Sequence, residues 1–513
     1  MNNSRIIGII DIGSNSIRLA IYELAAEGGY RVVGEFKESA RLSSRIHPDG
    51  SLPEEDIQRL VHILTRFKRI GDTYKAGEYR VVATAAIRNA SNSLQILESL
   101  RRESGLPVEI LSGEDEARIG FLGMIRTMDI PDGFLVDIGG GSTEVSLFRD
   151  RKIVQSVSFS FGAVNTTRVF STDGEFSNEQ LMGIRYMVEA AVAAEPWIKE
   201  SPGLPLVGLG GGVRTLCKIS QRKRRYSFPQ THHYLIPPEE MDELAAWLPS
   251  LPGEKRKKVD GLSKDRIDII IPGLIILQTL FQQAGATHYL VSGAGLRDGL
   301  FFETFAPAQP EDVQVAEYSA ANLLALHSTA PAAHTLQVRA LALQLYDAVT
   351  VEGGIPLSER HRLCFGIAAM LYRIGASLQY YQFPKHSFHL IAQTRIDGLT
   401  HREMLLCAYI ASFKTKSRTQ QAMSGYKDIL EDDDLETVAK LGSLLQVAVA
   451  LDVSETQALE LTSATLHNHS LLLGLRIKHD PSAEYREVEA LQKDFKKLWG
   501  LQLKLQGPSF STS

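Results

Sequence analysis

The sequence has few cysteines, no long apolar run and no net positive charge, and each of these absences excludes a class of protein. Its 513 residues include only three cysteines, Cys217, Cys364 and Cys407, spaced too widely to predict a disulfide framework or a zinc site. No apolar run approaches the ~20 residues that a membrane-spanning helix needs, and the first residues do not resemble a signal peptide. The formal net charge of −5 argues against general attraction to nucleic acid. We therefore expect a cytoplasmic protein with no membrane span and no nucleic-acid partner.

What is present indicates several globular domains. Apolar patterning alternates between strands and helices as far as residue 305 and is almost entirely helical beyond it. A Pro-containing stretch at 306–312 predicts a linker. We expect a first lobe at 1–125, a second at 126–305 and a helical domain at 313–513. The predicted helices of that domain are 336–349, 359–378, 401–413 and 434–451, followed by a strand-rich tail at 464–477.

Two short segments of the chain are nearly the same. Asp11-Ile12-Gly13-Ser14-Asn15-Ser16 is repeated as Asp137-Ile138-Gly139-Gly140-Gly141-Ser142, and each copy separates two apolar strands, which predicts a β-hairpin. Glycine allows close approach of a ligand, and clustered backbone N–H groups suit phosphate oxygens. A plain turn is the alternative for either hairpin alone. We predict that both tips hold one phosphorylated ligand through Gly13, Ser14, Asn15, Ser16, Gly139, Gly140, Gly141, Ser142 and Thr143.

A third glycine cluster, beginning at Gly208, follows an apolar strand and opens into a helix. Backbone amides at a helix start favour an anion, so Gly211 and Gly212 are further candidates for phosphate binding. A tight strand-to-helix turn is the alternative explanation.

An acidic segment, Ser112-Gly113-Glu114-Asp115-Glu116, begins a predicted helix. Ser112 and Asp115 have the spacing of a capping box, and acidic residues suit the helix dipole there. The capping interaction does not involve Glu116. The Glu116 carboxylate is therefore our candidate for the general base that activates water. Thr84 and Arg88 follow the predicted strand 79–83, where an open α/β sheet places ligand-binding groups.

Seven segments, in this order, resemble the exopolyphosphatase/guanosine pentaphosphate phosphatase (Ppx/GppA) family: DIGSNSIRL, ATAAIR, SGEDEAR, LVDIGGGSTE, GLGGGVRTL, the stretch 266–273 and SGAGLRDGL. The resemblance covers about residues 5–300. It implies an α/β fold of two actin-like lobes, the ribonuclease H-like superfold of actin, Hsp70 and sugar kinases. The remainder resembles the all-helical HD-like domain of the long exopolyphosphatases.

By this resemblance Glu116 is the catalytic glutamate, while Asp137 and Glu144 handle magnesium or the attacking water. Arg88 and Arg266 bind phosphate, and Asp11, Asp137 and Glu144 are the expected metal ligands. The implied cofactor is Mg²⁺, with or without an assisting monovalent cation, and a homodimer is expected because relatives form one. The implied reaction is processive release of orthophosphate from the end of inorganic polyphosphate.

Other functions are compatible with the same residues. The same site would serve to hydrolyse the 5′ γ-phosphate of guanosine pentaphosphate (pppGpp). Two basic runs, 222–225 and 255–258, favour a polymer instead if they form a local track for a polyanion, and solvated surface loops are the alternative for each run. A sugar or acetate kinase shares the superfold, and a non-catalytic polyphosphate or alarmone sensor is a binding-protein alternative.

The expected HD-like domain departs from the HD pattern at one point. Met370–Gly375 has no His-Asp pair, so we expect this domain to lack metallohydrolase chemistry.

Overall fold

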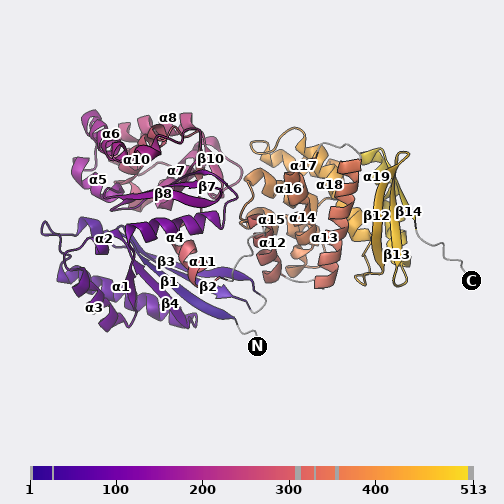
Figure 1. Ribbon diagram of the computed structural model, residues 1–513, viewed down its shortest axis with the longest axis horizontal. Helices are drawn as coiled ribbons and strands as arrows, with labels where there is room; N and C mark the ends of the chain where they lie inside the picture. Colours follow the sequence, from indigo (N-terminus) through magenta and orange to yellow (C-terminus); the bar gives the residue numbers. More distant parts are fainter. Residues whose placement is uncertain (1–3, 26–27, 307–313, 328–330, 353–356, 507–513) are drawn as a thin grey trace, which may run out of the picture. The chain divides into compact units, whose positions relative to one another are not determined.

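The computed structural model describes residues 4–25, 28–306, 314–327, 331–352 and 357–506. It divides the chain into two compact units, Met1–Pro310 and Glu311–Ser513. Figure 1 shows sheets flanked by helices in the first unit and mainly helices in the second. Within the described ranges, no helix combines the length and the apolar character needed to cross a bilayer.

The first sheet of the catalytic unit, as we call Met1–Pro310, has five strands in the order β3-β2-β1-β4-β5. They are β1 (Arg5–Ile12), β2 (Ser16–Leu24), β3 (Tyr30–Ser39), β4 (Glu78–Ala83) and β5 (Val108–Ile110). β1 and β2 form the first predicted hairpin, and β4 pairs parallel to β1. Helices α1 (Glu54–Thr73) and α3 (Ser93–Ser104) cover one face with an apolar stripe that includes Ile57 and Phe67.

The second sheet has six strands in the order β10-β11-β9-β6-β7-β8. They are β6 (Gly133–Ile138), β7 (Thr143–Arg149), β8 (Lys152–Phe159), β9 (Leu206–Leu209), β10 (Tyr234–Ile236) and β11 (Tyr289–Val291). β6 and β7 form the second predicted hairpin. One face is covered mainly by α5 (Ala163–Phe170), α6 (Asn178–Ala193), α7 (Gly210–Arg224), α8 (Pro238–Ser250) and α10 (Ile270–Gln283).

Two crossing helices connect these sheets. α4 (Gly113–Ile125) packs Ile119 against the first sheet and Met124 against the second, so it forms a layer between them (Figure 1). α11 (Leu296–Thr304) packs Phe301 on the first sheet, although the predicted second lobe, 126–305, includes it. The helices meet at glycines: a Cβ on Gly299 would lie 1.9 Å from the carbonyl oxygen of Ile119.

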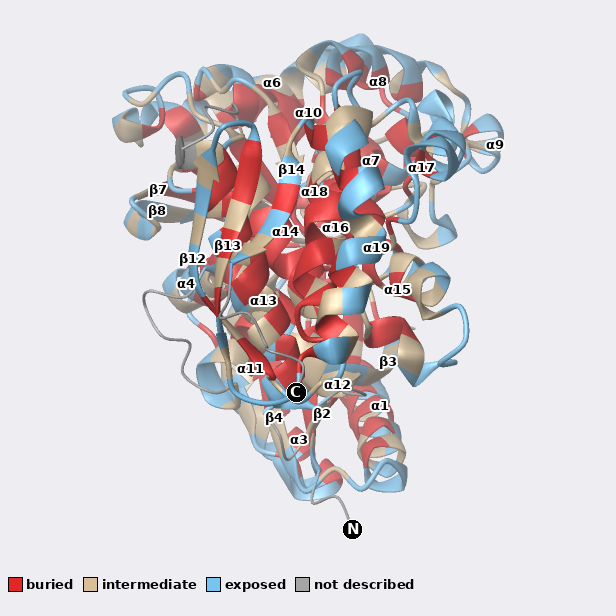
Figure 2. Ribbon diagram, turned by 90° about the vertical axis from the view of Figure 1, so that its right-hand side faces the viewer, coloured by how far each residue is buried: buried red, intermediate tan, exposed pale blue. Residues whose placement is uncertain are grey.

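The second unit consists mainly of helices that pack against one another. They are α12 (Val315–Leu326), α13 (Ala332–Asp347), α14 (Glu359–Leu371), α15 (Phe383–Gln393), α16 (His401–Ala411), α17 (Lys416–Met423), α18 (Asp434–Ala450) and α19 (Ser482–Trp499). Figure 2 shows α14, α16 and α18 buried along most of their length. The unit is not entirely helical, because β12 (Leu459–His467), β13 (Ser470–Ile477) and β14 (Gln502–Gln506) form a sheet.

The predicted helix 359–378 is broken near its middle. α14 ends at Leu371, and a short 3₁₀ helix, Ile374–Ser377, follows. The Ser387 hydroxyl donates to the carbonyl of Tyr372 at 2.7 Å and accepts from the amide of Gly375 at 2.9 Å. These bonds replace the backbone hydrogen bonds that a continuous helix would make at this point. The apolar spacing of residues 359–378 does not predict them.

Tyr372 lies at this break, within the segment 370–375 in which the sequence lacks a His-Asp pair. His334 lies 2.6 Å from the Tyr372 hydroxyl through Nε2 and 2.8 Å from an Asp452 carboxylate oxygen through Nδ1. The two contacts fit a ring that donates from Nδ1 and accepts at Nε2. Both ring nitrogens are thus engaged within the protein, and a likeness to HD domains stays a prediction.

The close helix crossing leads to a stability prediction. Gly299→Ala forces a Cβ into the backbone of α4, so we expect it to destabilise the fold by about 1–3 kcal/mol. Thermal unfolding measures the effect. Gly77→Ala is the matched control, because a Cβ there meets nothing within 4 Å. An unchanged melting temperature for Gly299→Ala would contradict this packing.

Candidate active site

The tips of the two hairpins meet beside a cavity in the catalytic unit. A Cβ on Gly140 would lie 2.9 Å from the Cβ of Ser14 and 3.3 Å from the amide nitrogen of Asn15, so only glycine fits there. The cavity holds about 150 Å³. The predicted residues that line it are Asp11, Gly13, Ser14, Asn15, Ser16, Thr84, Glu116, Asp137, Gly139, Gly140, Ser142, Gly211, Gly212 and Arg266. The structure thus brings together segments that are distant in the sequence.

Local capping places Glu116 in this cavity. The Ser112 hydroxyl accepts from the Asp115 amide at 3.0 Å and begins α4, which puts Glu116 in the first helical turn. The predicted reciprocal contact differs, because the Asp115 carboxylate accepts from the Ser112 hydroxyl rather than from its amide. Arg88 donates to the Glu116 carboxylate at 3.0 Å and to the carbonyl of Leu111 at 2.8 Å. Arg88 does not itself line the cavity; it orients the carboxylate that does.

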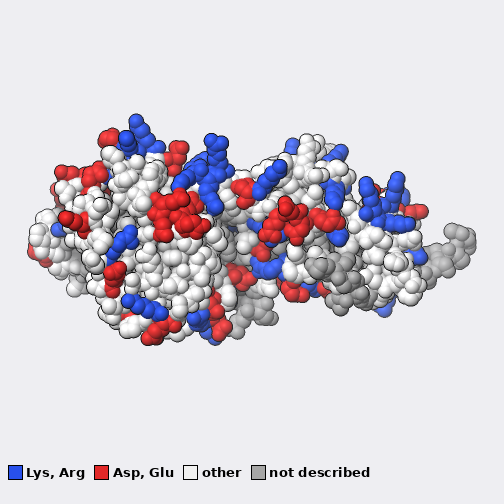
Figure 3. Space-filling model, turned by 90° about the horizontal axis from the view of Figure 1, so that it is seen from above, with Lys and Arg blue, Asp and Glu red and all other residues white. Residues whose placement is uncertain are grey.

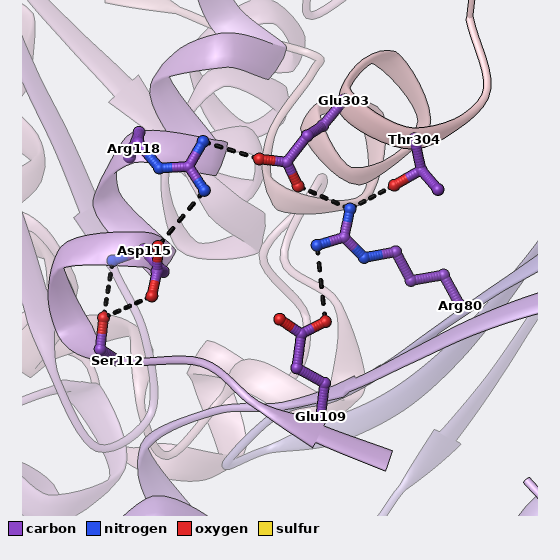
Figure 4. Close-up of polar contacts among 7 residues, drawn as sticks. All are labelled: Arg80, Glu109, Ser112, Asp115, Arg118, Glu303 and Thr304. Atoms are coloured by element: carbon purple, nitrogen blue, oxygen red, sulfur yellow. Dashed lines mark hydrogen bonds and ion pairs between the residues drawn. The ribbon is translucent and has the colours of Figure 1, made fainter. Parts of the chain in front are cut away.

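Polar contacts at the solvent side of α4 hold this helix in place (Figure 4). Glu303 on α11 accepts from Arg118 on α4 at 2.7 Å and from Arg80 on β4 at 2.6 Å. Arg118 also pairs with Asp115 at 3.3 Å, and Arg80 contacts Thr304. Exposed pairs contribute at most about 1 kcal/mol each. The network therefore orients the start of α4 more than it stabilises the fold.

Three predicted residues of the second hairpin lie outside the cavity. The Thr143 hydroxyl donates to the carbonyl of Phe161 at 2.7 Å, and the carbonyl of Gly141 accepts from a side-chain amide at 3.2 Å. Glu144 is 4% exposed and accepts from the Ser158 hydroxyl at 2.8 Å. It lies behind the cavity, where it shares a small void of about 10 Å³ with Glu116 and Asp137.

The clustered carboxyl groups resist ionisation. Burial, followed by the charge of Glu144, raises the pKa of Glu116 well above its ordinary value. Burial and the charge of Asp137 raise the pKa of Glu144 to about 7, and burial raises the pKa of Asp137 to about 6. Raised carboxyl pKa values in a cavity are typical of groups that exchange protons near neutral pH.

Sequence reasoning missed three arginines that line the same cavity, Arg18, Arg214 and Arg297. Arg18 lies two residues after Ser16 on β2, so strand alternation puts both on one face. Burial, with the charges of Arg18 and Arg297, lowers the pKa of Arg214 to about 10. Arg297 pairs with Glu35 at 2.7 Å. Two features of the sequence could have indicated two of these arginines. Strand alternation after Ser16 points to Arg18, and the segment SGAGLRDGL contains Arg297.

Ion pairs join the two lobes near this cavity. Arg41, after β3, donates to both carboxylate oxygens of Asp268, at 2.7 and 3.2 Å. Lys37 on β3 pairs with Asp265, which precedes the cavity-lining Arg266. These contacts hold the second lobe against β3 and help to position Arg266.

The predicted metal ligands divide into two groups. Asp11 and Asp137 both line the cavity, whereas Glu144 does not. No cluster of three or more Asp, Glu, His or Cys side chains suited to a metal occurs among the residues that the structure describes. Mg²⁺ is often held by one or two carboxylates together with substrate phosphates. The pair of Asp11 and Asp137 therefore fits an ion that binds together with its substrate.

The fold and the cavity define a unit of two helix-covered sheets with an arginine-lined cavity and a largely buried carboxylate, that of Glu116. The model of the Ppx/GppA phosphatase family matches residues 21–306, and that of domain III of the same phosphatases matches 317–493. The chain belongs to the Ppx/GppA phosphatase family.

Individual relatives agree with this assignment. Over 475 residues and 89% of each chain, the protein is 26% identical to a guanosine-5′-triphosphate,3′-diphosphate pyrophosphatase of Aeromonas hydrophila. A bifunctional 3-dehydroquinate synthase/phosphatase of Fusobacterium nucleatum is 28% identical over 302 residues, which span 55% of this chain and 44% of that protein.

Solved structures match the catalytic unit. A Ppx/GppA family member from Aquifex aeolicus is 27% identical with a TM-score of 0.51, covering 58% of this chain and 97% of that one. An exopolyphosphatase from Cytophaga hutchinsonii shares the fold at 23% identity and a TM-score of 0.54, with the same coverage of both chains.

The carboxyl cluster leads to a pH prediction. A base must be deprotonated to act, so activity should be lost as pH falls through the raised pKa of Glu116, well above 4.5. Glu144→Gln removes a neighbouring negative charge and should move this acid limb to lower pH. The measurement is kcat/KM for phosphate release between pH 5 and 9. Glu114→Gln, an exposed acid on the same helix, is the control and should leave the limb unchanged. An unmoved limb in Glu144→Gln would exclude this coupling.

Proposed function

We propose that the protein is an exopolyphosphatase, which hydrolyses the terminal phosphoanhydride bond of inorganic polyphosphate and releases orthophosphate. The observation that carries this proposal is the composition of the cavity. Four guanidinium groups, those of Arg18, Arg214, Arg266 and Arg297, line it, and no aromatic ring does among the residues described. Guanidinium forks suit phosphate oxygens, while a bare phosphate chain has no ring that needs stacking.

Glu116 acts as the general base. Water attacks the terminal phosphorus, Glu116 takes a proton from that water, and the bond from phosphorus to the bridging oxygen breaks. The electrons of that bond stay on the bridging oxygen, which leaves as the new end of the chain. Phosphoryl transfer needs little covalent help. Hairpin amides and guanidinium groups therefore supply most of the catalysis by positioning the chain and stabilising the developing charge.

Asp11 and Asp137 are the groups that would hold Mg²⁺. The ion, when bound, supplies positive charge to the phosphate oxygens. Glu144 keeps a different task in this proposal: it lies behind Glu116 and tunes its protonation.

The two basic runs do not make one exposed track for a polymer. Arg256 in the second run is 1% exposed and donates to Glu175 and to the carbonyl of Gly174. Lys223 in the first run pairs with Glu243. Figure 3 shows acidic and basic side chains mingled on the face that it draws. Processive release stays a prediction. The two basic runs support it less in the folded protein than they did in the sequence alone.

A second candidate is hydrolysis of the 5′ γ-phosphate of pppGpp. The observation that favours it is the likeness along 89% of both chains to the Aeromonas hydrophila pyrophosphatase. The same base and arginines would serve, with aliphatic side chains such as Ile269 and Ile270 beside Arg266 as the surface for the nucleoside.

One comparison tests the proposed function. We expect Mg²⁺-dependent orthophosphate release, with kcat/KM for long-chain polyphosphate at least about tenfold above that for pppGpp, a difference of ~1.4 kcal/mol. Glu116→Gln should lower kcat by about 100-fold or more with little change in substrate binding. Glu114→Gln serves as the matched control.

The possible outcomes separate the candidates. A tenfold preference for pppGpp would replace polyphosphate by the nucleotide as substrate. Binding of either compound without phosphate release would indicate a sensor, and phosphorylation of an alcohol by ATP would indicate a kinase.

The metal assignment has its own test. Chelation with EDTA should abolish phosphate release and added Mg²⁺ should restore it. Asp11→Asn and Asp137→Asn should each raise the Mg²⁺ concentration for half-maximal rate by about tenfold, because each removes one carboxylate ligand. Glu144→Gln should change the pH profile without raising this concentration. A raised Mg²⁺ requirement in Glu144→Gln alone would reverse the assignment.

A further inference from the structure

The second unit contains a pocket of about 400 Å³ that has no part in the site described above. It lies among α15, α16 and α17, and all the residues that line it fall between Pro384 and Tyr426. Its volume is within the range of about 300–1,000 Å³ that is usual for small-molecule sites.

Three aromatic rings form one wall of this pocket, which we call the helical-unit pocket. The rings of Phe388 and Tyr409 have centroids 4.7 Å apart, and those of Tyr409 and Tyr426 are 6.4 Å apart. Tyr409 is 3% exposed, whereas Phe388 and Tyr426 are half-buried. Such rings offer flat apolar surface on which a nucleobase stacks irrespective of its identity.

Three cations stand around the same pocket. Lys385, Lys414 and Arg418 line it and are exposed, and none has an ion-pair partner among the described residues. Among the described residues, no Asp or Glu lines the pocket, although the whole chain has a formal net charge of −5. Elsewhere in the unit, cations such as Arg362 and Arg402 are paired with carboxylates. Unpaired cations of this kind are suited to phosphate groups.

We propose that the helical-unit pocket binds a nucleoside di- or triphosphate, with the base against the aromatic wall and the phosphates among Lys385, Lys414 and Arg418. Both features are needed for this assignment. A phosphate chain without a base would leave the ring surface unused, and an uncharged aromatic compound would leave three cations unpaired. The catalytic cavity has the opposite character, since guanidinium groups line it and no ring does within the part of the chain that the structure describes. The proposal does not depend on which substrate that cavity hydrolyses.

Photolabelling of the full-length protein locates such a site directly. The probes are 8-azidoadenosine 5′-diphosphate and 8-azidoguanosine 5′-diphosphate, followed by proteolysis and mapping of the labelled peptides. We expect label in peptides from residues 383–426. Unmodified ADP or GDP should compete for that label, while inorganic tripolyphosphate at the same concentration should compete at least about tenfold less well, because it lacks a base to stack.

Matched variants test the two halves of the pocket. Lys414→Ala with Arg418→Ala should weaken labelling of 383–426 at least about tenfold by removing phosphate partners. Tyr426→Ala should weaken it about tenfold by removing a stacking surface. Lys496→Ala with Lys497→Ala, two exposed lysines on α19 outside the pocket, should leave it unchanged. Thermal unfolding of each variant shows whether the fold is intact, and for any variant that unfolds, the competition data for the unaltered protein decide.

Three results would overturn the proposal. Label confined to residues 5–300 would assign nucleotide binding to the catalytic unit alone. Equal competition by tripolyphosphate and GDP would show a site for bare phosphate chains. An equal loss of label in the α19 control would show unspecific attraction to positive charge.

Discussion

Burial of the Glu116 carboxylate between Arg88 and Glu144 is the interaction on which the catalytic unit depends. Arg88 holds the carboxylate by a hydrogen bond, while burial and the charge of Glu144 make its ionised form costly. A carboxylate in this balance exchanges its proton far closer to neutral pH than an exposed one. The surrounding scaffold exists to keep that geometry: Ser112 begins the helix, and Glu303 ties it to the neighbouring elements.

The two hairpins have the same backbone arrangement, but the side chain that lies opposite the aspartate differs in charge. Asp11 lies opposite Arg18 across the first hairpin, and Asp137 lies opposite Glu144 at the same place in the second. In the function proposed above, the first hairpin therefore contributes a cation for phosphate oxygens, and the second contributes a carboxyl group beside the proposed base Glu116. The same hairpin, used twice, would then supply both the phosphate-binding and the acid–base groups of the site.

The two units differ in the side chains that line their cavities. The cavity of the catalytic unit has four arginines and no ring among the residues described, whereas the pocket of the second unit combines three rings with three cations. Within the second unit, the Tyr372 hydroxyl and an Asp452 carboxylate oxygen contact the two ring nitrogens of His334.

The local features follow from residues that are close together in the sequence. They are the hairpin turns with their glycines, the apolar stripe of α1 and the cap that starts the helix of Glu116. These features depend on neighbours within a few positions, so spacing reveals them. Tertiary structure alone decided that Arg214 joins the cavity and that Glu144 stays behind it. It also decided that Ser387 interrupts the helix after Leu371. Such contacts join residues far apart in the chain, and their energies depend on burial, which only the folded packing sets.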